Sequence, residues 1–113
     1  MIDARRMEVF TALYDNKLNE VLTTQAMILD EHSFKNQLEE YNIIFCGNGA
    51  AKFQSLINNS NAQFNTVQYS AKDMVQLSLD KFNNKDLADI AYSSPIYGKE
   101  FYTTTPKKLL TNE

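Results

Sequence analysis

Short runs rich in apolar residues, separated by polar turn residues, open the chain, which is typical of strands. Residues 1–4 and 8–14 predict two strands joined by a connection at 5–7. Residues 20–28, rich in β-branched side chains, predict a third strand after a turn cluster at 15–19. Both faces of the 8–14 segment are largely apolar, as expected of an interior strand. The three strands and their short turns predict an antiparallel meander.

The period then changes to that of a helix. Asp30 is the candidate N-cap, and Phe34, Leu38 and Tyr41 recur on one helical face. A continuous apolar run at 43–46 follows, which favours a buried strand that leads into a glycine turn.

A second helix at 50–57 and a strand at 66–69 come next. Ser70 caps a third helix with Asp73 at the capping-box position. The buried side of this helix is expected to consist of Met74, Val75, Leu77, Leu79 and Phe82. Residues 86–92 can add another short helix. The tail from Ser93 holds Pro95 and Pro106 and is expected to be extended or irregular.

The resulting order is βββ-α-β-α-β-α. It predicts an α/β fold whose sheet mixes antiparallel and parallel strands, as in α+β proteins. An antiparallel meander followed by two crossover units gives a five-stranded mixed sheet with flanking helices. This is the order of the ribonuclease-H-like unit, the repeated half of actin-like ATPases. We expect residues 1–92 to form this lobe and residues 93–113 to form an extended tail.

Composition narrows the functional classes. The chain has 113 residues, 43% of them hydrophobic and 22% charged, which suits one globular domain. A net charge of -3 argues against autonomous nucleic-acid binding, which needs a concentrated basic face. Cys46 is the only cysteine, so an internal disulfide is excluded and a reducing cytoplasm is favoured. No apolar run approaches the roughly 20 residues of a membrane span, so we expect a soluble, cytoplasmic protein.

Several stretches resemble the bacterial TsaB (YeaZ-type) family. Residues 3–5 followed by 8–10 are similar to its signature "DAR, two residues, EV, aromatic". The glycine turn at 45–50 and the "P, apolar, Y" element at 95–97 also resemble family features. Residues 101–102 and 105–109 of this chain resemble the C-terminal ending of the family in one bacterial branch.

The resemblance implies that the whole protein has two actin-like lobes and that this chain is the second. The predicted strand at the very start of the chain agrees with this expectation. TsaB proteins are catalytically inactive relatives of TsaD, which transfers a threonylcarbamoyl group to adenosine 37 of tRNA. The implied partners are TsaD and the ATPase TsaE, with tRNA reached only through the complex. Pairing with TsaD chiefly uses helices of the first lobe in this family. An isolated second lobe exposes its apolar interlobe surface, through which it can self-associate.

The resemblance and the fold order suggest two candidate sites. Asp3, Arg5 and Glu8 are expected to form a polar cluster at the mouth of the cleft between lobes. Arginine side chains in the first turn crowd the approach of a phosphate, which favours salt bridging or partner contact over nucleotide binding. The second candidate is a turn that borders the adenosine of a bound nucleotide in this fold class: Gly47, Asn48, Gly49 and Ala50. A plain tight turn is the favoured interpretation, and a vestigial ATP or ADP site is the alternative.

No catalytic group stands out. Cys46 lies in an apolar run, which favours a buried core residue over a nucleophile. His32 is the only histidine, so neither a nucleophile–base pair nor a histidine metal site is easily built. The basic pairs at 5–6 and 107–108 are expected on the solvated surface, with contact to TsaD-bound tRNA as the alternative. We expect a noncatalytic scaffold without a cofactor or metal. The alternatives are an active ATPase or phosphotransferase and, lowest, the peptidase implied by the family's older M22 glycoprotease label.

Overall fold

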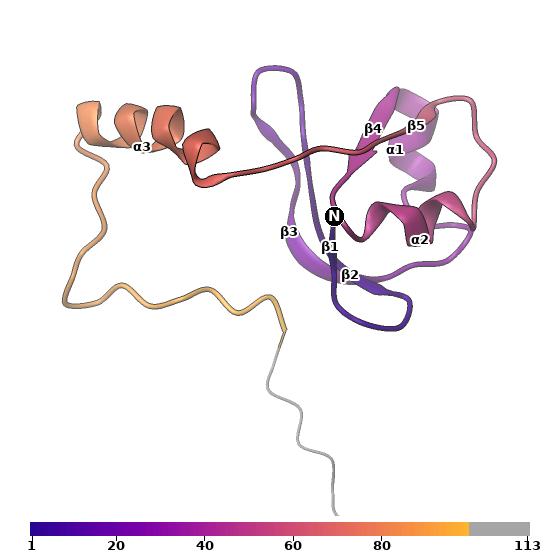
Figure 1. Ribbon diagram of the computed structural model, residues 1–113, viewed down its shortest axis with the longest axis horizontal. Coiled ribbons are helices and arrows are strands. Elements are labelled where there is room, and N and C mark those ends of the chain that lie inside the picture. Colours follow the sequence, from indigo (N-terminus) through magenta and orange to yellow (C-terminus); the bar gives the residue numbers. More distant parts are fainter. Residues whose placement is uncertain (100–113) are drawn as a thin grey trace, which may run out of the picture.

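The computed structural model describes residues 1–99, and residues 100–113 lie outside that range. The fold is a small mixed α/β domain with one antiparallel and one parallel sheet (Figure 1). The elements are β1 (Ile2–Asp3), β2 (Glu8–Tyr14), β3 (Glu20–Ile28), α1 (Lys35–Glu40), β4 (Ile43–Cys46), α2 (Ala50–Gln54), β5 (Ala62–Asn65), a 3-10 turn (Ala71–Asp73) and α3 (Met74–Asn83).

The predicted meander is confirmed. The first three strands form an antiparallel sheet in the order β1-β2-β3, with Ile2 opposite Phe10 and Val9 opposite Met27. The prediction that β2 is an interior strand holds within this sheet. Val9 and Thr11 are buried on one of its faces, whereas Phe10 on the other face is half-buried.

The other two strands form a separate parallel sheet, in which Phe45 of β4 lies opposite Phe64 of β5. The described strands therefore lie in two sheets, and their pairing does not show the single five-stranded sheet expected from the sequence. β1 pairs with β2 over only Ile2 and Asp3 and with no other described strand.

The core fills the space between the antiparallel sheet and the short helices. Its buried side chains are Val9, Leu29, Phe34, Leu38, Ile43, Phe45, Ala50 and Phe53. Phe53 is fully buried, and its ring centroid lies 5.0 Å from that of Phe45 and 5.4 Å from that of Phe34. Edge-to-face contacts of this kind add about 0.5–1.5 kcal/mol per pair beyond the burial of the rings. These aromatic contacts join α1, α2 and β4 into one unit.

The helix around residue 38 begins later than predicted. Asp30 does not cap it; its Oδ1 accepts hydrogen bonds from the amide of His32 and the hydroxyl of Ser33, both at 2.9 Å. The N-cap position is Phe34, whose φ of 61° is left-handed. Phe34 and Leu38 are buried as expected, but Tyr41 is 48% exposed because the chain turns extended there.

The fifth strand lies at residues 62–65, not at 66–69 as expected. The amide of Ile43 donates to Asn61 O at 2.8 Å, which fixes the register at the start of the strand. Phe64 stacks on Phe45 with a centroid distance of 5.3 Å. The apolar residues Val67 and Tyr69, which suggested a strand, are exposed.

The predicted capping box is formed at the 3-10 turn that leads into α3, not at α3 itself, and α3 has no buried side. Asp73 Oδ2 accepts from the amide of Ser70 at 2.7 Å, as in a capping box. All five of its expected core positions are at least 48% exposed, because the extended segment after β5 carries α3 away from both sheets (Figure 1). The short helix expected at 86–92 is not formed. Ile96 and Tyr97, in the stretch that resembles the family's "P, apolar, Y" element, are also exposed.

Candidate functional site

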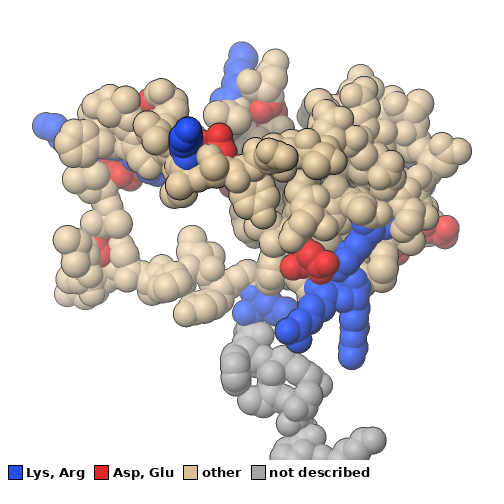
Figure 2. Space-filling view, in the orientation of Figure 1, with Lys and Arg blue, Asp and Glu red and all other residues tan. Residues whose placement is uncertain are grey.

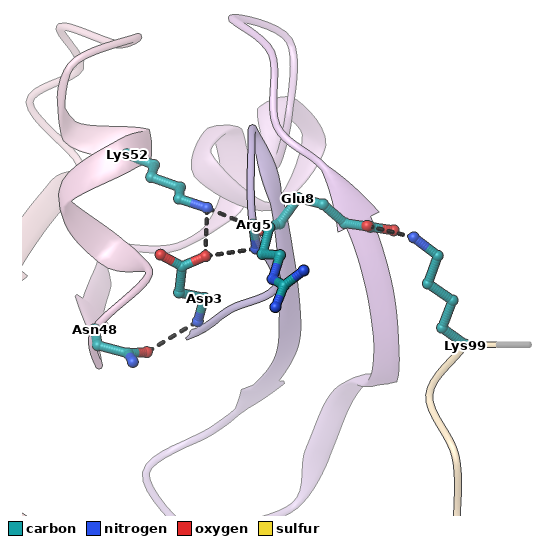
Figure 3. A network of polar contacts seen from close by, with 6 residues as sticks. All are labelled: Asp3, Arg5, Glu8, Asn48, Lys52 and Lys99. Atoms are coloured by element: carbon teal, nitrogen blue, oxygen red, sulfur yellow. Dashed lines mark hydrogen bonds and ion pairs between the residues drawn. The ribbon is translucent and has the colours of Figure 1, made fainter. Parts of the chain in front are cut away.

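Two turns that are far apart in the sequence lie against each other at one end of the domain. The Oδ1 of Asn48 accepts a hydrogen bond from the amide of Asp3 at 2.9 Å, across 45 residues of chain (Figure 3). The amide of Gly49 donates to Met1 O at 3.3 Å. The structure therefore brings the two candidate sites of the sequence together at the junction of β1 with the glycine turn.

The glycines allow this close approach. Gly47 has a φ of 95°, and a Cβ there would overlap Met1 O. A Cβ on Gly49 would lie 2.9 Å from Val9 Cγ1. Only glycine fits the left-handed position without strain, so the turn has a structural role. The amides of Gly49 and Ala50 donate to Met1 O and Gly47 O, and they are therefore engaged within the chain.

Lys52, in the helix after the glycine turn, forms an ion pair with Asp3 and so links the two turns. Its Nζ lies 2.6 Å from Asp3 Oδ1 and donates to Glu8 O at 3.2 Å, while the lysine side chain is only 19% exposed (Figure 3). The hydrogen bond from Lys52, and then the one from the Arg5 amide, hold the pKa of Asp3 below its usual value. Asp3 is therefore a fixed carboxylate at neutral pH and not a proton donor.

Glu8 forms a second ion pair in the same network. Its Oε2 lies 2.6 Å from Lys99 Nζ, and the glutamate side chain is 18% exposed (Figure 3). This contact brings residue 99 back to the start of β2. Both carboxylates of the expected polar cluster are thus paired with lysines, an arrangement suited to holding structure.

Arg5 and Arg6 are strained and exposed. Their φ angles are 72° and 48°, a left-handed conformation that costs roughly 1–2 kcal/mol for each non-glycine residue. Within residues 1–99 neither guanidinium forms an ion pair. Lys and Arg side chains gather at this end of the domain (Figure 2).

Lys52 and Lys99 were not singled out from the sequence. Lys52 lies 49 positions from Asp3, and Lys99 lies 91 positions from Glu8. Such pairings arise only from the fold, so no local spacing could have indicated them.

The other sequence candidates lie apart from this network. Cys46 is half-buried, not fully buried as expected, although its carbonyl accepts from the Met1 amino group at 2.7 Å. His32 is exposed next to Glu31. No group of three or more metal-ligating side chains occurs in the part of the chain that the structure describes.

A cavity of about 340 Å³ lies beside the glycine turn, between α2 and the segment after β5. Its lining includes the amide side chains of Asn48, Gln54 and Asn65 and the ring of Tyr69. The lining contains no charged side chain among the described residues. Such a cavity suits a neutral ring more than a phosphate, which is bound by cations and free amides.

Comparison of the chain with family models, curated proteins and solved structures gives no match. The resemblance to TsaB proteins stays a prediction from the motifs. Among the helices at residues 1–99, none is long and apolar enough to cross a bilayer.

Proposed function

We propose that the five strands belong to one ribonuclease-H-like sheet in the order β3-β2-β1-β4-β5. The support is the position of Met1, whose amino group donates to Cys46 O and whose carbonyl accepts from Gly49. These bonds extend β1 toward β4, on the edge of β1 opposite to β2. The three-stranded and two-stranded sheets then read as two parts of one sheet, with α1 and α2 on one face.

On this basis we propose that the chain is the second lobe of a TsaB-like scaffold subunit, which activates TsaD for threonylcarbamoyladenosine formation in tRNA. One observation carries the proposal. The stretches that resemble the family at 3–10 and 45–50 pack on each other, and the ion pair of Asp3 with Lys52 joins them. The two family-like stretches thus form one structural unit. The exposed Arg5 and Arg6 lie next to this unit and can contact a partner.

The paired state of the carboxylates supports a scaffold more than a catalyst. A general acid or base needs a group that changes protonation near neutral pH. Asp3 has a lowered pKa, and the carboxylate of Glu8 is 2.6 Å from a lysine. In the proposed scaffold these groups hold the turn that presents Arg5.

A reconstituted tRNA-modification assay tests the proposal. It contains TsaD, TsaE, the enzyme that supplies the threonylcarbamoyl donor, and the two-lobed subunit that carries this chain. We expect modified tRNA only when the subunit is present, and less of it with Arg5→Ala. A Lys85→Ala variant, altered on the segment after α3, is the matched control and keeps activity. Equal product without the subunit would refute the scaffold role.

The second candidate is the nucleotide-binding half of an actin-like ATPase or phosphotransferase. The cavity beside Gly47 and Asn48 favours it, because its amide side chains can bond the edge of a base. Titration of the protein with ATP and with adenosine tests it. Saturable binding that Asn48→Ala weakens would support this candidate, and no binding would remove it.

A further inference from the structure

Asn48 is followed by Gly49, and it is the only asparagine of the chain that precedes a glycine. An asparagine in this position loses its side-chain amide most readily, because glycine has no side chain to hinder attack by its own backbone nitrogen. Asn48 is exposed to water and lies at the contact of residues 1–3 with the turn at 47–49, which we call the junction. A chemically labile pair of residues therefore lies where β1 meets the glycine turn.

Deamidation at this pair needs only a base and water. The backbone nitrogen of Gly49 loses its proton and bonds to Cγ of Asn48, the Cγ–Nδ2 bond breaks, and ammonia leaves with a proton returned by water. The product is a five-membered succinimide ring. Water then opens the ring at one of its two carbonyl carbons, which gives either aspartate or isoaspartate. In isoaspartate the backbone runs through Cβ and Cγ, and no oxidant or reductant takes part in any step.

Two hydrogen bonds of the junction oppose ring closure. The amide that must lose its proton, that of Gly49, donates to Met1 O at 3.3 Å. The side chain that it must attack is held on β1, since Asn48 Oδ1 accepts from the Asp3 amide at 2.9 Å (Figure 3). Ring closure removes the amide proton and turns Cγ toward the Gly49 nitrogen, so both bonds must break first.

Close packing also keeps the turn from rearranging while the junction is closed. Gly49 is buried, and a Cβ on it would lie 2.9 Å from Val9 Cγ1 and 3.1 Å from the carbonyl carbon of Ile2. Gly47 has a φ of 95° and lies directly against Met1 O. Amides that are bonded and packed in this way react with solvent only when the local structure opens. The rate of deamidation therefore depends on how often the junction opens.

We propose that Asn48 is a deamidation site that the closed junction protects, and that its isoaspartate product prevents the junction from closing again. Isoaspartate adds one carbon to the backbone before Gly49, where residues 2, 3 and 9 already fill the surrounding space. The added carbon displaces the Gly49 amide from Met1 O. Aspartate, in contrast, keeps the backbone length and retains an oxygen that accepts from the Asp3 amide.

Deamidation rates of the whole chain test the protection. The chain and a synthetic peptide of residues 44–52 are held at neutral pH and body temperature, and mass spectrometry of digests follows the gain of one mass unit at Asn48. We expect the folded chain to react at least about tenfold more slowly than the peptide, which corresponds to an opening free energy of about 1.4 kcal/mol. Equal rates in chain and peptide would overturn the proposal.

Matched variants show whether the junction is the barrier. Gly47→Ala should raise the rate at Asn48 about tenfold, because the strain of a left-handed alanine falls on the closed state. Lys52→Ala removes the ion pair with Asp3 and should raise the rate less. Each rate is divided by that of a peptide with the same substitution, which removes any effect on the intrinsic reaction.

Two control variants make the same changes away from the junction. Gly98→Ala and Lys72→Ala alter an exposed glycine and an exposed lysine, and both should leave the rate at Asn48 unchanged. An equal rise in the variants and in their controls, or no rise in either junction variant, would overturn the proposal.

The isoaspartate product has a test of its own. Ion-exchange and reversed-phase chromatography isolate it, and electron-transfer fragmentation distinguishes it from the aspartate product. We expect faster hydrogen exchange at the amides of Asp3 and Gly49 in the isoaspartate form, and unchanged exchange in the aspartate form. Unchanged protection of both amides in the isoaspartate form would overturn the proposed block to closure.

Discussion

Gly47 is the residue whose conformation most constrains the junction of the two turns. Its φ of 95° and the overlap of a Cβ with Met1 O both oppose any side chain. Gly47→Ala should lower the free energy of unfolding by about 2–3 kcal/mol, since a strained backbone costs about 1–3 kcal/mol and the contact must also open. Urea denaturation measures this.

Gly98→Ala is the control for that substitution. A Cβ at Gly98 would meet only the edge of the Phe10 ring, which can move. We expect a change within about 0.5 kcal/mol, as for most surface sites. Equal losses for the two variants would mean that the junction at Gly47 is not formed in solution.

Asp3 gives the ion pair with Lys52 a pH dependence. Because the folded pKa of Asp3 lies below the ordinary aspartate value of 3.8, the pair stabilises the fold above that value. The contribution is lost as the pH falls through the folded pKa. Asp3→Asn should therefore be less stable than the unaltered chain at pH 7, and the two stabilities should converge in acid below about pH 4.

Urea denaturation at several pH values follows this difference. Asp86→Asn is the matched control, because Asp86 also has a pKa lowered by a lysine, Lys81, but lies outside the core. It should leave the stability of the core unchanged at every pH. A stability difference for Asp3→Asn that is the same at pH 7 and in acid would contradict the assignment.

At the scale of elements, α2 and α3 differ in what their aromatic residues contact. Phe53 of α2 is fully buried, whereas Phe82 of α3 is 66% exposed. Phe53→Ala should cost about 3–5 kcal/mol, which is the usual loss for a buried phenylalanine. Phe82→Ala should change stability by at most about 0.5 kcal/mol. Thermal or urea unfolding compares them, and a large loss at Phe82 would mean that α3 packs on the core in solution.

The same contrast shows what could be predicted from the sequence. The strands at 8–14, 20–28 and 43–46 were predicted with their observed bounds, because alternation and turn residues are local signals. The pattern at α3 correctly predicted a helix. It also predicted that the apolar side of this helix is buried, which requires another element to cover it. Amphipathic pattern fixes which face is apolar but not what covers it.

The candidate site divides in the same way. The glycine turn and the Asp3 to Glu8 segment could be found from local motifs. Their contact through Asn48 and Lys52 could not, because it depends on β1 lying next to the end of β4. Long-range polar pairs of this kind carry no spacing in the sequence.

At the scale of the whole molecule, the folded core ends with β5. Every described residue from Asn65 onward is exposed, and the radius of gyration is 18.9 Å, against about 13 Å for a compact chain of this length. Residues 66–99 therefore add surface but few core contacts. A chain that ends at Tyr69 should keep the free energy of unfolding within about 1 kcal/mol, since loss of one partly exposed ion pair costs little.

The denaturant slope gives this last prediction its sharpest test. The slope scales with the surface that unfolding exposes. Residues that are already exposed in the folded state contribute little to it, so the shortened chain should keep nearly the same slope. A chain that ends at Gln54 is the control, because it loses β5, the stacking of Phe64 on Phe45 and the bond from Ile43 to Asn61. That chain should lose cooperative unfolding, whereas a marked fall in slope for the chain ending at Tyr69 would place α3 in the cooperative core.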